Sequence, residues 1–306
     1  MIVRFILLSI VALHASSALA QTDSEKQAKT PTTEEITVQV DQISGPVYML
    51  TGRGGNIGLC VGEDGVFMID DQYAPMTPAI RQAIAQVTTD PVRFILNTHW
   101  HSDHVGGNEN FGESGAVIVA HNNVRVRMAS DQFMPFMQRE VPASPASALP
   151  IVTFDDAVTF HMNGNAIRAF HVANAHTDGD AIVYFDQAGV VHMGDVFWNG
   201  QYPFIDTHSG GSIRGTIAAV DTALAMIDED TAVIPGHGPL GGRAELLDYR
   251  EMLQGIADRI QALIDNGKSL EEVQAEAPSA DWDPVWGNGF IKPEAFVGMV
   301  YEDLQG

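Results

Sequence analysis

The sequence predicts an α+β fold in which two β-sheets pack together with helices on their outer faces. Strand-like runs are followed by a helical segment in the first half of the chain, and the same order occurs again in the second half. Apolar residues make up 45% of the 306 residues and recur throughout, which is enough to bury a large core. No linker is long enough to demand separate domains.

The first half contains short apolar runs separated by turn-forming residues. We expect strands at residues 36–40, 47–50, 56–61, 66–69 and 92–96. Residues 78–87 have helical spacing. Four prolines within residues 131–150 predict a long irregular loop there.

The second half has the same pattern. We expect strands at residues 157–160, 166–172, 181–185, 190–193 and 231–234. Helices are expected at residues 213–227 and 246–264. The second of these begins a C-terminal helical extension, residues 246–306, which should pack on a domain formed by residues 35–245.

The N-terminus has the features of a secretory signal peptide. Arg4 precedes a nine-residue apolar stretch, and Ala18-Leu19-Ala20 has the small residues of a cleavage site. The stretch is too short for a transmembrane helix, which needs about twenty residues. We therefore expect residues 1–20 to be removed, residues 21–34 to be a flexible leader, and the protein to be periplasmic or secreted without inserting into a membrane.

The charge balance and the cysteine content exclude several classes of function. Sixteen basic residues stand against 39 acidic ones, so the net charge is −23. Such a chain repels phosphate backbones, so we expect a small-molecule substrate and no nucleic acid as a partner. Cys60 is the single cysteine, which makes a disulfide within the chain impossible, and its apolar neighbours predict a buried structural role.

A dense group of ligand-type residues follows the strand expected at 92–96. His99, His101, Asp103 and His104 occur within six residues. In an extended segment, side chains two residues apart point the same way, so His99 and His101 should face one site. Each imidazole or carboxylate needs a partner when it is buried, and a metal ion would supply one. The group therefore predicts a metal site.

Three further residues of this kind lie beside strand ends. His176 lies between two strands of the second half, Asp195 follows the strand at 190–193, and His237 follows the strand at 231–234. Glycines flank these positions and allow close approach of the backbone. Together with the first group they make seven nitrogen and oxygen ligands.

The motif His-x-His-x-Asp-His at residues 99–104, followed in order by these three residues, resembles the signature of the metallo-β-lactamase superfamily. The resemblance covers roughly residues 35–245. It implies a four-layer αβ/βα sandwich with the metal site at one edge between the sheets. It also implies a ligand set in which one ion binds His99, His101 and His176, the other binds Asp103, His104 and His237, and Asp195 bridges the two.

The resemblance further implies a hydrolase with two zinc ions (Zn²⁺) per chain. Imidazole and carboxylate ligands suit zinc, although iron and manganese also accept them. A metal-bound hydroxide would attack a carbonyl carbon, with Asp103 or a metal-bound water handling the proton. Asp70 matches a strand-end aspartate of the family, which would orient a ligand histidine; the alternative is an ordinary strand-end carboxylate.

The substrate remains open between several hypotheses. One is a β-lactam ring, and a second is a lactone, ester or thioester; the third is a non-enzymatic periplasmic metal-binding protein. The best-known β-lactamase subclass has Cys where Asp195 stands and a substrate-binding Lys shortly after it, which residues 195–200 lack. An aspartate at this position is the commoner arrangement in the hydrolases of the second hypothesis, which it motivates.

Several other residues have two possible roles at this stage. Thr98 either braces the ligand group or is an ordinary strand-end residue. His121 is expected to cap a helix rather than to bind metal. Aromatic residues near the ligands either line a substrate pocket or belong to the core: Trp100, Phe197 and Trp198. Residues 202–204 and the loop at 131–150 are candidates for the rim of the pocket.

Overall fold

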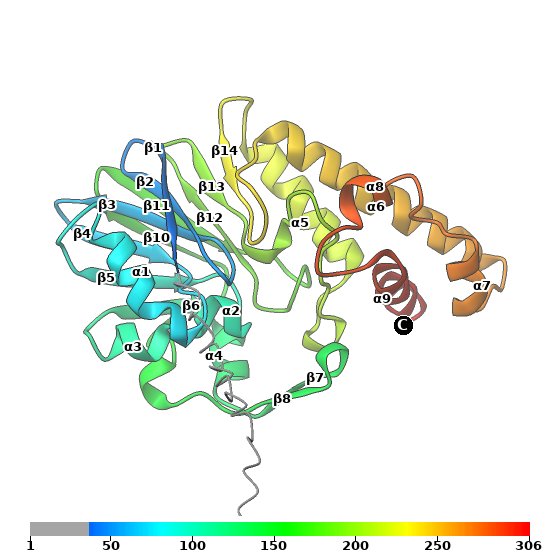
Figure 1. Cartoon of the computed structure of the whole chain (residues 1–306), viewed down its shortest axis with the longest axis horizontal. Coiled ribbons are helices and arrows are strands. Elements are labelled where there is room, and N and C mark those ends of the chain that lie inside the picture. The colour runs from blue at the N-terminus through cyan, green and yellow to red at the C-terminus, as the bar shows by residue number, and fades with distance from the viewer. Residues whose placement is uncertain (1–36) are drawn as a thin grey trace, which may run out of the picture. The chain divides into compact units, whose positions relative to one another are not determined.

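A seven-stranded sheet is built from the first half of the chain (Figure 1). The structure is a computed structural model that describes residues 37–306, so the signal peptide and leader predicted within residues 1–34 lie outside the described residues. The strands, in their order across the sheet, are β1 (Gln39–Ser44), β2 (Val47–Thr51), β3 (Ile57–Gly62), β4 (Gly65–Ile69), β5 (Val92–Asn97), β6 (Val117–His121) and β9 (Val152–Phe154).

The pairing within this sheet changes from antiparallel to parallel along its width. β1 to β4 form an antiparallel meander, whereas β4, β5, β6 and β9 run parallel. Because parallel strands end at the same edge of a sheet, the residues that follow β4 and β5 lie side by side. These residues include Asp70 and the histidine-rich segment 99–104.

The second sheet has five strands: β10 (Ala157–Met162), β11 (Asn165–His171), β12 (Ala181–Phe185), β13 (Val190–His192) and β14 (Ala232–Ile234). β13 and β14 are parallel, and the other neighbours are antiparallel. The parallel pair brings the segments that contain Asp195 and His237 to one edge.

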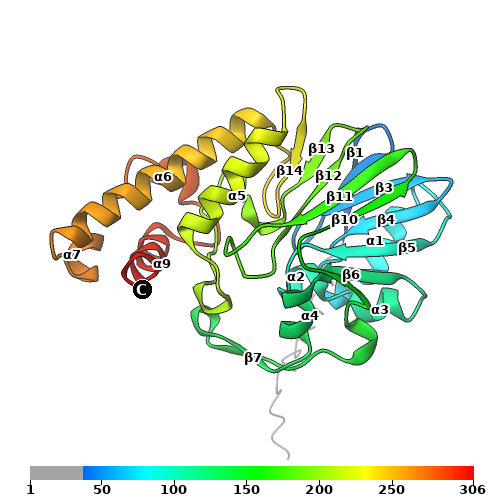
Figure 2. The same cartoon turned by 180° about the vertical axis from the view of Figure 1, so that it is seen from behind.

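Helices cover the outer faces of both sheets (Figures 1 and 2). The first sheet is covered by α1 (Thr77–Ile84) and α3 (Asn108–Gly112); α2 (Ser102–Val105) and α4 (Asn122–Met128) follow β5 and β6. The second sheet is covered by α5 (Ile213–Met226) and α6 (Arg243–Asp265). The last elements are α7 (Leu270–Ala275), α8 (Asp283–Trp286) and α9 (Pro293–Gln305), and α9 packs on α6. This arrangement confirms the predicted α+β four-layer sandwich.

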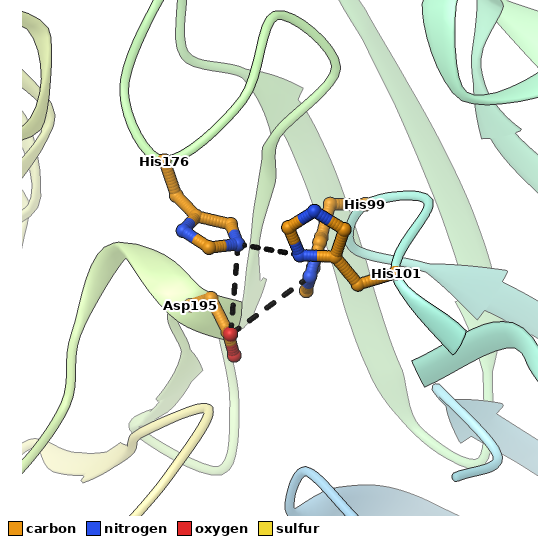
Figure 3. Close-up of side chains that lie close together, drawn as sticks. All are labelled: His99, His101, His176 and Asp195. Carbon is orange, nitrogen blue, oxygen red and sulfur yellow. Dashed lines mark hydrogen bonds and ion pairs between the residues drawn. The ribbon is translucent and has the colours of Figure 1, made fainter. Parts of the chain in front are cut away.

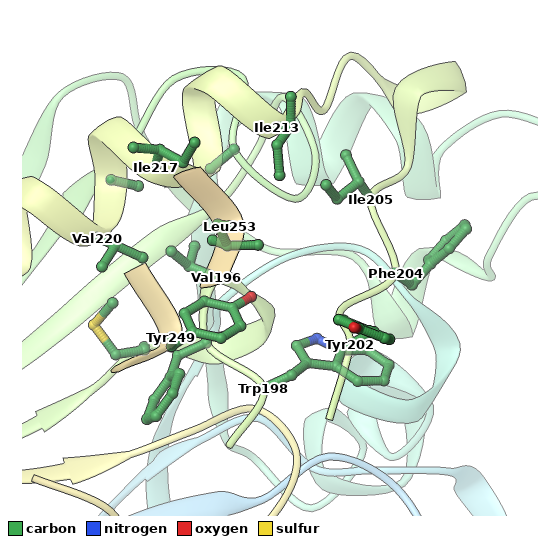
Figure 4. Packing of buried hydrophobic residues seen from close by; sticks show 14 of the residues in the cluster. Val196, Trp198, Tyr202, Phe204, Ile205, Ile213, Ile217, Val220, Tyr249 and Leu253 are labelled. Carbon is green, nitrogen blue, oxygen red and sulfur yellow. The ribbon is translucent and has the colours of Figure 1, made fainter. Parts of the chain in front are cut away.

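Successive residues along a strand pack on opposite faces of the sheet, one facing the other sheet and the next facing the helices. In β4, Phe67 and Ile69 pack against the second sheet, whereas Val66 and Met68 pack under α1. Cys60 belongs to the core between the sheets and is fully buried, as expected. On the far side of the second sheet, residues of α5 and α6 pack together with the segment that follows β13 (Figure 4).

The prediction of an irregular loop over residues 131–150 is wrong in part. The structure forms a hairpin there, β7 (Gln132–Met134) and β8 (Arg139–Val141). Pro135 opens the turn between the two strands, and Pro142 directly follows the second one. Pro135 and Pro142 therefore mark the ends of two short strands. At these positions the N–H that proline lacks is not needed for pairing between the strands. Within residues 37–306, no helix combines the length and apolar character needed to cross a bilayer.

Candidate metal centre

Seven ligand-type side chains from four segments of the chain meet where strands of both sheets end. His99 and His101 follow β5, and Asp103 and His104 lie in α2. His176 lies between β11 and β12, Asp195 lies in a single turn after β13, and His237 follows β14. The structure thus brings together every residue that the sequence nominates as a metal ligand.

His99, His101, His176 and Asp195 form a first group, in which one ligand atom of each lies within 4.8 Å of the others (Figure 3). His176 Nε2 is 2.9 Å from His101 Nδ1. Asp195 Oδ2 is 3.6 Å from His176 Nε2 and 3.8 Å from His99 Nε2. All four residues are buried.

Asp103, His104 and His237 form a second group. Asp103 Oδ2 lies 3.3 Å from His237 Nε2 and 3.8 Å from His104 Nε2. Asp195 contacts this group as well, because its Oδ1 is 3.0 Å from His104 Nε2 and its Oδ2 is 3.4 Å from His237 Nε2. Its carboxylate therefore lies between the two groups, as a bridging ligand must.

Three of the histidines are held by acceptors on the far side of the ring. His176 Nδ1 donates to the carbonyl of Phe204 at 2.7 Å, and His101 Nε2 donates to Asp206 Oδ2 at 2.9 Å. His104 Nδ1 donates to Asp70 Oδ2 at 2.8 Å. In the neutral ring the proton then sits on the outer nitrogen, so the nitrogen that faces the centre has its lone pair available.

Asp70 connects the two groups through Thr98. Asp70 Oδ1 accepts the backbone N–H of Thr98 at 2.8 Å, and its Oδ2 accepts the Thr98 hydroxyl at 2.7 Å. Because that hydroxyl proton is used, Thr98 Oγ1 accepts from His99 Nδ1 at 3.1 Å. One fully buried carboxylate thus orients His104 directly and His99 through Thr98.

The electrostatics of the second group differ from those of the first. Burial works to raise the pKa of Asp103, but the charges of His104 and His237 outweigh it and lower that pKa to about 2. Burial works to lower the pKa of His237, but Asp195 and Asp103 raise it to about 9. Burial alone dominates at His176 and lowers its pKa to about 4. The pKa values of His104 and His237 in the second group are thus raised, whereas those of His99 and His176 in the first group are lowered.

The donor set fits metal ions. Among the described residues, four buried atoms at the centre lack a hydrogen-bond partner of good geometry: Nε2 of His99, His104 and His237, and Oδ1 of Asp195. Leaving several such atoms unpaired in one place is costly, and a cation would satisfy them. Imidazole nitrogens and carboxylate oxygens are the ligands of zinc sites with an open position.

Two glycines allow the backbone to approach the ligands closely. A Cβ at Gly236 would collide with Asp195 Oδ1, and a Cβ at Gly55 would collide with the His104 ring. Only glycine fits at these positions without moving a ligand.

A cavity of about 270 Å³ opens above the centre. Its floor is formed by ligand residues: His101, Asp103, Asp195 and His237. Its apolar wall is formed by Met134, Met137, Trp198, Phe204 and Phe290. Polar side chains complete the lining: Arg53, Tyr73, Ser102, Arg139 and Gln201. A small molecule can therefore reach the side of the centre that faces this cavity.

The structure also separates the residues for which two roles were open. Trp198 and Phe204 line the cavity, whereas Trp100 and Phe197 are buried in the core beyond it. His121 Nδ1 accepts from Asn123 N at the start of α4, which is the capping role expected for it.

Sequence reasoning missed Asp206 and Arg139. Asp206 lies 105 residues after its partner His101, and an isolated aspartate gives no sign of such a pairing. The nearby segment 202–204 was a candidate for the rim, but only the fold shows that Asp206 reaches a ligand. Arg139 lies within residues 131–150, for which the sequence predicted an irregular loop, so nothing placed its side chain beside the ligands.

Comparison with known proteins agrees with this geometry. The Metallo-beta-lactamase superfamily model matches residues 50–239, which is more than half of the chain. The metallo-beta-lactamase type 2 of Bacillus cereus is 18% identical over 257 residues, covering 81% of this chain and 95% of that protein. The hydroxyacylglutathione hydrolase of Polaromonas sp. is 27% identical over 157 residues, covering 51% of this chain and 52% of that protein.

A solved structure shows the same fold. The metallo-beta-lactamase from Pontibacter korlensis superposes with a TM-score of 0.59 at 21% sequence identity, and the match covers 71% of this chain and 99% of that chain. The extent of the family match, taken with the strand order and the clustered ligands, shows that the chain belongs to the metallo-beta-lactamase superfamily and is a metal-dependent hydrolase.

Proposed function

We propose that the protein is an exported dinuclear zinc hydrolase that cleaves a carbonyl compound, with a β-lactam ring as the first candidate substrate. One observation carries the proposal: two groups of nitrogen and oxygen ligands share Asp195 at the floor of a cavity. When bound there, two zinc ions would polarise a carbonyl oxygen and lower the pKa of a coordinated water toward neutrality.

The chain's own residues position the reactants around that chemistry. Asp103 remains ionised at neutral pH because its pKa is about 2, and its side chain is about one-fifth exposed to the cavity. Asp103 Oδ2 would therefore be able to accept a hydrogen bond from the attacking water or to take up its proton. Trp198, whose ring lies 4.2 Å from that of His237, and Phe204 shield this side of the cavity from bulk water.

Two substrate classes have support. Similarity to the Bacillus cereus metallo-beta-lactamase favours β-lactams. Asp195 in place of a cysteine, and similarity to a hydroxyacylglutathione hydrolase, favour a lactone, ester or thioester. A non-enzymatic metal-binding protein would hold the ions without hydrolysing any of these.

The test is a hydrolysis panel run on the zinc-loaded protein together with two variants. The panel contains a penicillin, a cephalosporin, a carbapenem, lactones, thioesters and aryl esters. We expect turnover of at least one class. Asp195→Ala should lose one of two metal equivalents and most of the activity, because Asp195 contacts both ligand groups. His121→Ala should keep both equivalents because its ring faces His171 instead.

Each result of this experiment has a clear meaning. Turnover of the β-lactams selects the first class, and turnover restricted to lactones, thioesters or esters selects the second. Full metal content without any hydrolysis would overturn the enzymatic proposal. Two metal equivalents in Asp195→Ala would overturn the bridging role.

Asp70 should control metal affinity although it binds no metal itself. Asp70→Asn removes the carboxylate that orients His104 and, through Thr98, His99. Loss of such an outer contact lowers metal affinity about 10- to 100-fold. Competition with a chromophoric chelator measures this change. Asp90→Asn, in an exposed loop, is the control; equal affinities of the two variants would contradict the orienting role.

Zinc binding should release protons in a pH-dependent way. In the metal-free protein the pKa of His237 is raised to about 9, so the ring holds a second proton at about pH 7.5 and must lose it to bind a cation. The contribution of His237 should therefore disappear as the pH rises through about 9. Calorimetry in buffers of different ionisation enthalpy measures the release. A release that does not decrease between about pH 7.5 and about pH 9.5 would contradict this prediction.

We also propose export, on the basis of the N-terminal sequence. Arg4, the apolar stretch after it and Ala18-Leu19-Ala20 support cleavage after Ala20. The mature protein should then begin at Gln21, which intact-mass measurement on protein recovered from the periplasm or the medium would show. Recovery of the uncleaved chain from the cytoplasm would contradict export.

A further inference from the structure

We propose that Arg139 binds a carboxylate of the substrate, so that the cavity selects a molecule that combines a carboxylate with an apolar body. The inference deepens the proposed function, because it names the substrate class for the same cavity. It concerns a residue that is neither a candidate metal ligand nor a partner of one.

The guanidinium of Arg139 is held at the side of the cavity next to the metal centre. Arg139 begins β8, lines the cavity, and donates from Nη2 to Ser102 Oγ at 3.0 Å. Ser102 stands between His101 and Asp103 in the sequence, and all three line the same cavity. One hydrogen bond therefore anchors the guanidinium beside the floor and leaves most of its five N–H donors for other acceptors.

The charge of Arg139 is not neutralised by a neighbouring carboxylate. Within residues 37–306, Arg139 forms no ion pair, whereas five other arginines do: Arg127, Arg168, Arg243, Arg250 and Arg259. Acidic residues outnumber basic ones by 39 to 16, so carboxylate partners are plentiful in this chain. An arginine directed at a cavity in such a chain is suited to an anionic group brought by a ligand.

The rest of the cavity wall is apolar, so we expect the remainder of the substrate to be apolar as well. Phe204 and Phe290 line the cavity, and Phe136 in the β7–β8 turn packs against both, at ring-centroid distances of 5.3 Å and 6.2 Å. Phe290 is 60% exposed and Phe136 is 43% exposed. Large apolar groups that stay this exposed at a cavity mouth gain contacts when an apolar ligand covers them.

A carboxylate matches the planar guanidinium of Arg139, because its two oxygens can accept two parallel N–H···O bonds. One carboxylate at Arg139 and an apolar group on the aromatic wall satisfy both parts of the lining.

The first test measures binding and does not depend on turnover. Zinc-loaded protein is titrated calorimetrically with 4-phenylbutyrate and with 4-phenylbutanamide, which has nearly the same shape without the charge. We expect the carboxylate to bind about tenfold more tightly, since a hydrogen-bonded charge pair gives about this ratio. Arg139→Gln should weaken carboxylate binding about tenfold and leave amide binding within about twofold, and Arg139→Lys should weaken carboxylate binding less.

Two control variants separate a local contact from a general effect of charge. Arg214→Gln removes the same charge from α5, where the side chain contacts Gln261 on α6. Glu140→Gln changes the residue next to Arg139 in β8, and its side chain lines a different hollow. Both controls should keep the wild-type preference. A carboxylate preference that is unchanged in Arg139→Gln, or that falls equally in Arg214→Gln, would overturn the proposal.

A second measurement distinguishes this inference from the proposed function. If the panel identifies a hydrolysed class, matched substrates with and without a carboxylate are compared for KM and kcat. Arg139→Gln should raise KM for the charged substrate about tenfold with kcat little changed, because the contact is present in both the ground and transition states. An equal KM for the two substrates in the wild type would overturn the inference while leaving hydrolysis intact. Conversely, absence of all turnover would overturn the proposed function, and the calorimetric preference would still decide the role of Arg139.

Discussion

The convergence of seven ligand-type side chains, five of them buried, at one meeting point of the two sheets is the constraint on which the rest of the site depends. Unpaired nitrogen and oxygen atoms are tolerated in a protein interior only when something binds them. The outer hydrogen bonds of Asp70, Asp206 and the Phe204 carbonyl fix one nitrogen of several rings and so direct the other inward. A cation would satisfy these atoms, and this ties metal binding to the stability of the centre.

The topology explains why residues so distant in sequence converge. Parallel pairing of β4 with β5, and of β13 with β14, places the segments after these strands at one edge of each sheet. Asp195 and His237 come from the second pair, and Asp70 and the histidine-rich segment come from the first. The two sheets pack on a shared core, and this packing brings the two edges together. The position of the candidate ligands thus depends on the direction of these strands, and the helices mainly cover the outer faces of the sheets.

Much of this could be predicted from the sequence, because the signals involved are local. The apolar runs gave most strands to within a few residues, and His99 to His104 occur in one short motif after a buried strand. Asp195 and His237 were identifiable because each directly follows a strand and has glycine beside it. Asp206 was not identifiable, because its importance lies in a hydrogen bond across 105 positions of the chain. Arg139 was missed because prolines that end two short strands look the same, in sequence, as prolines in an irregular loop.

The floor and the wall of the cavity come from different parts of the chain, which differ in how freely their residues can be substituted. Its floor comes from strand ends whose spacing is fixed by the sheets and by glycines such as Gly236, where any larger residue would displace a ligand. The surrounding wall draws on the β7–β8 hairpin and on Phe290 near the C-terminus, neither of which holds a ligand. Substitutions in this outer part could therefore redirect selectivity during evolution or in the laboratory while the reactive machinery stays untouched, so that one scaffold serves many chemistries.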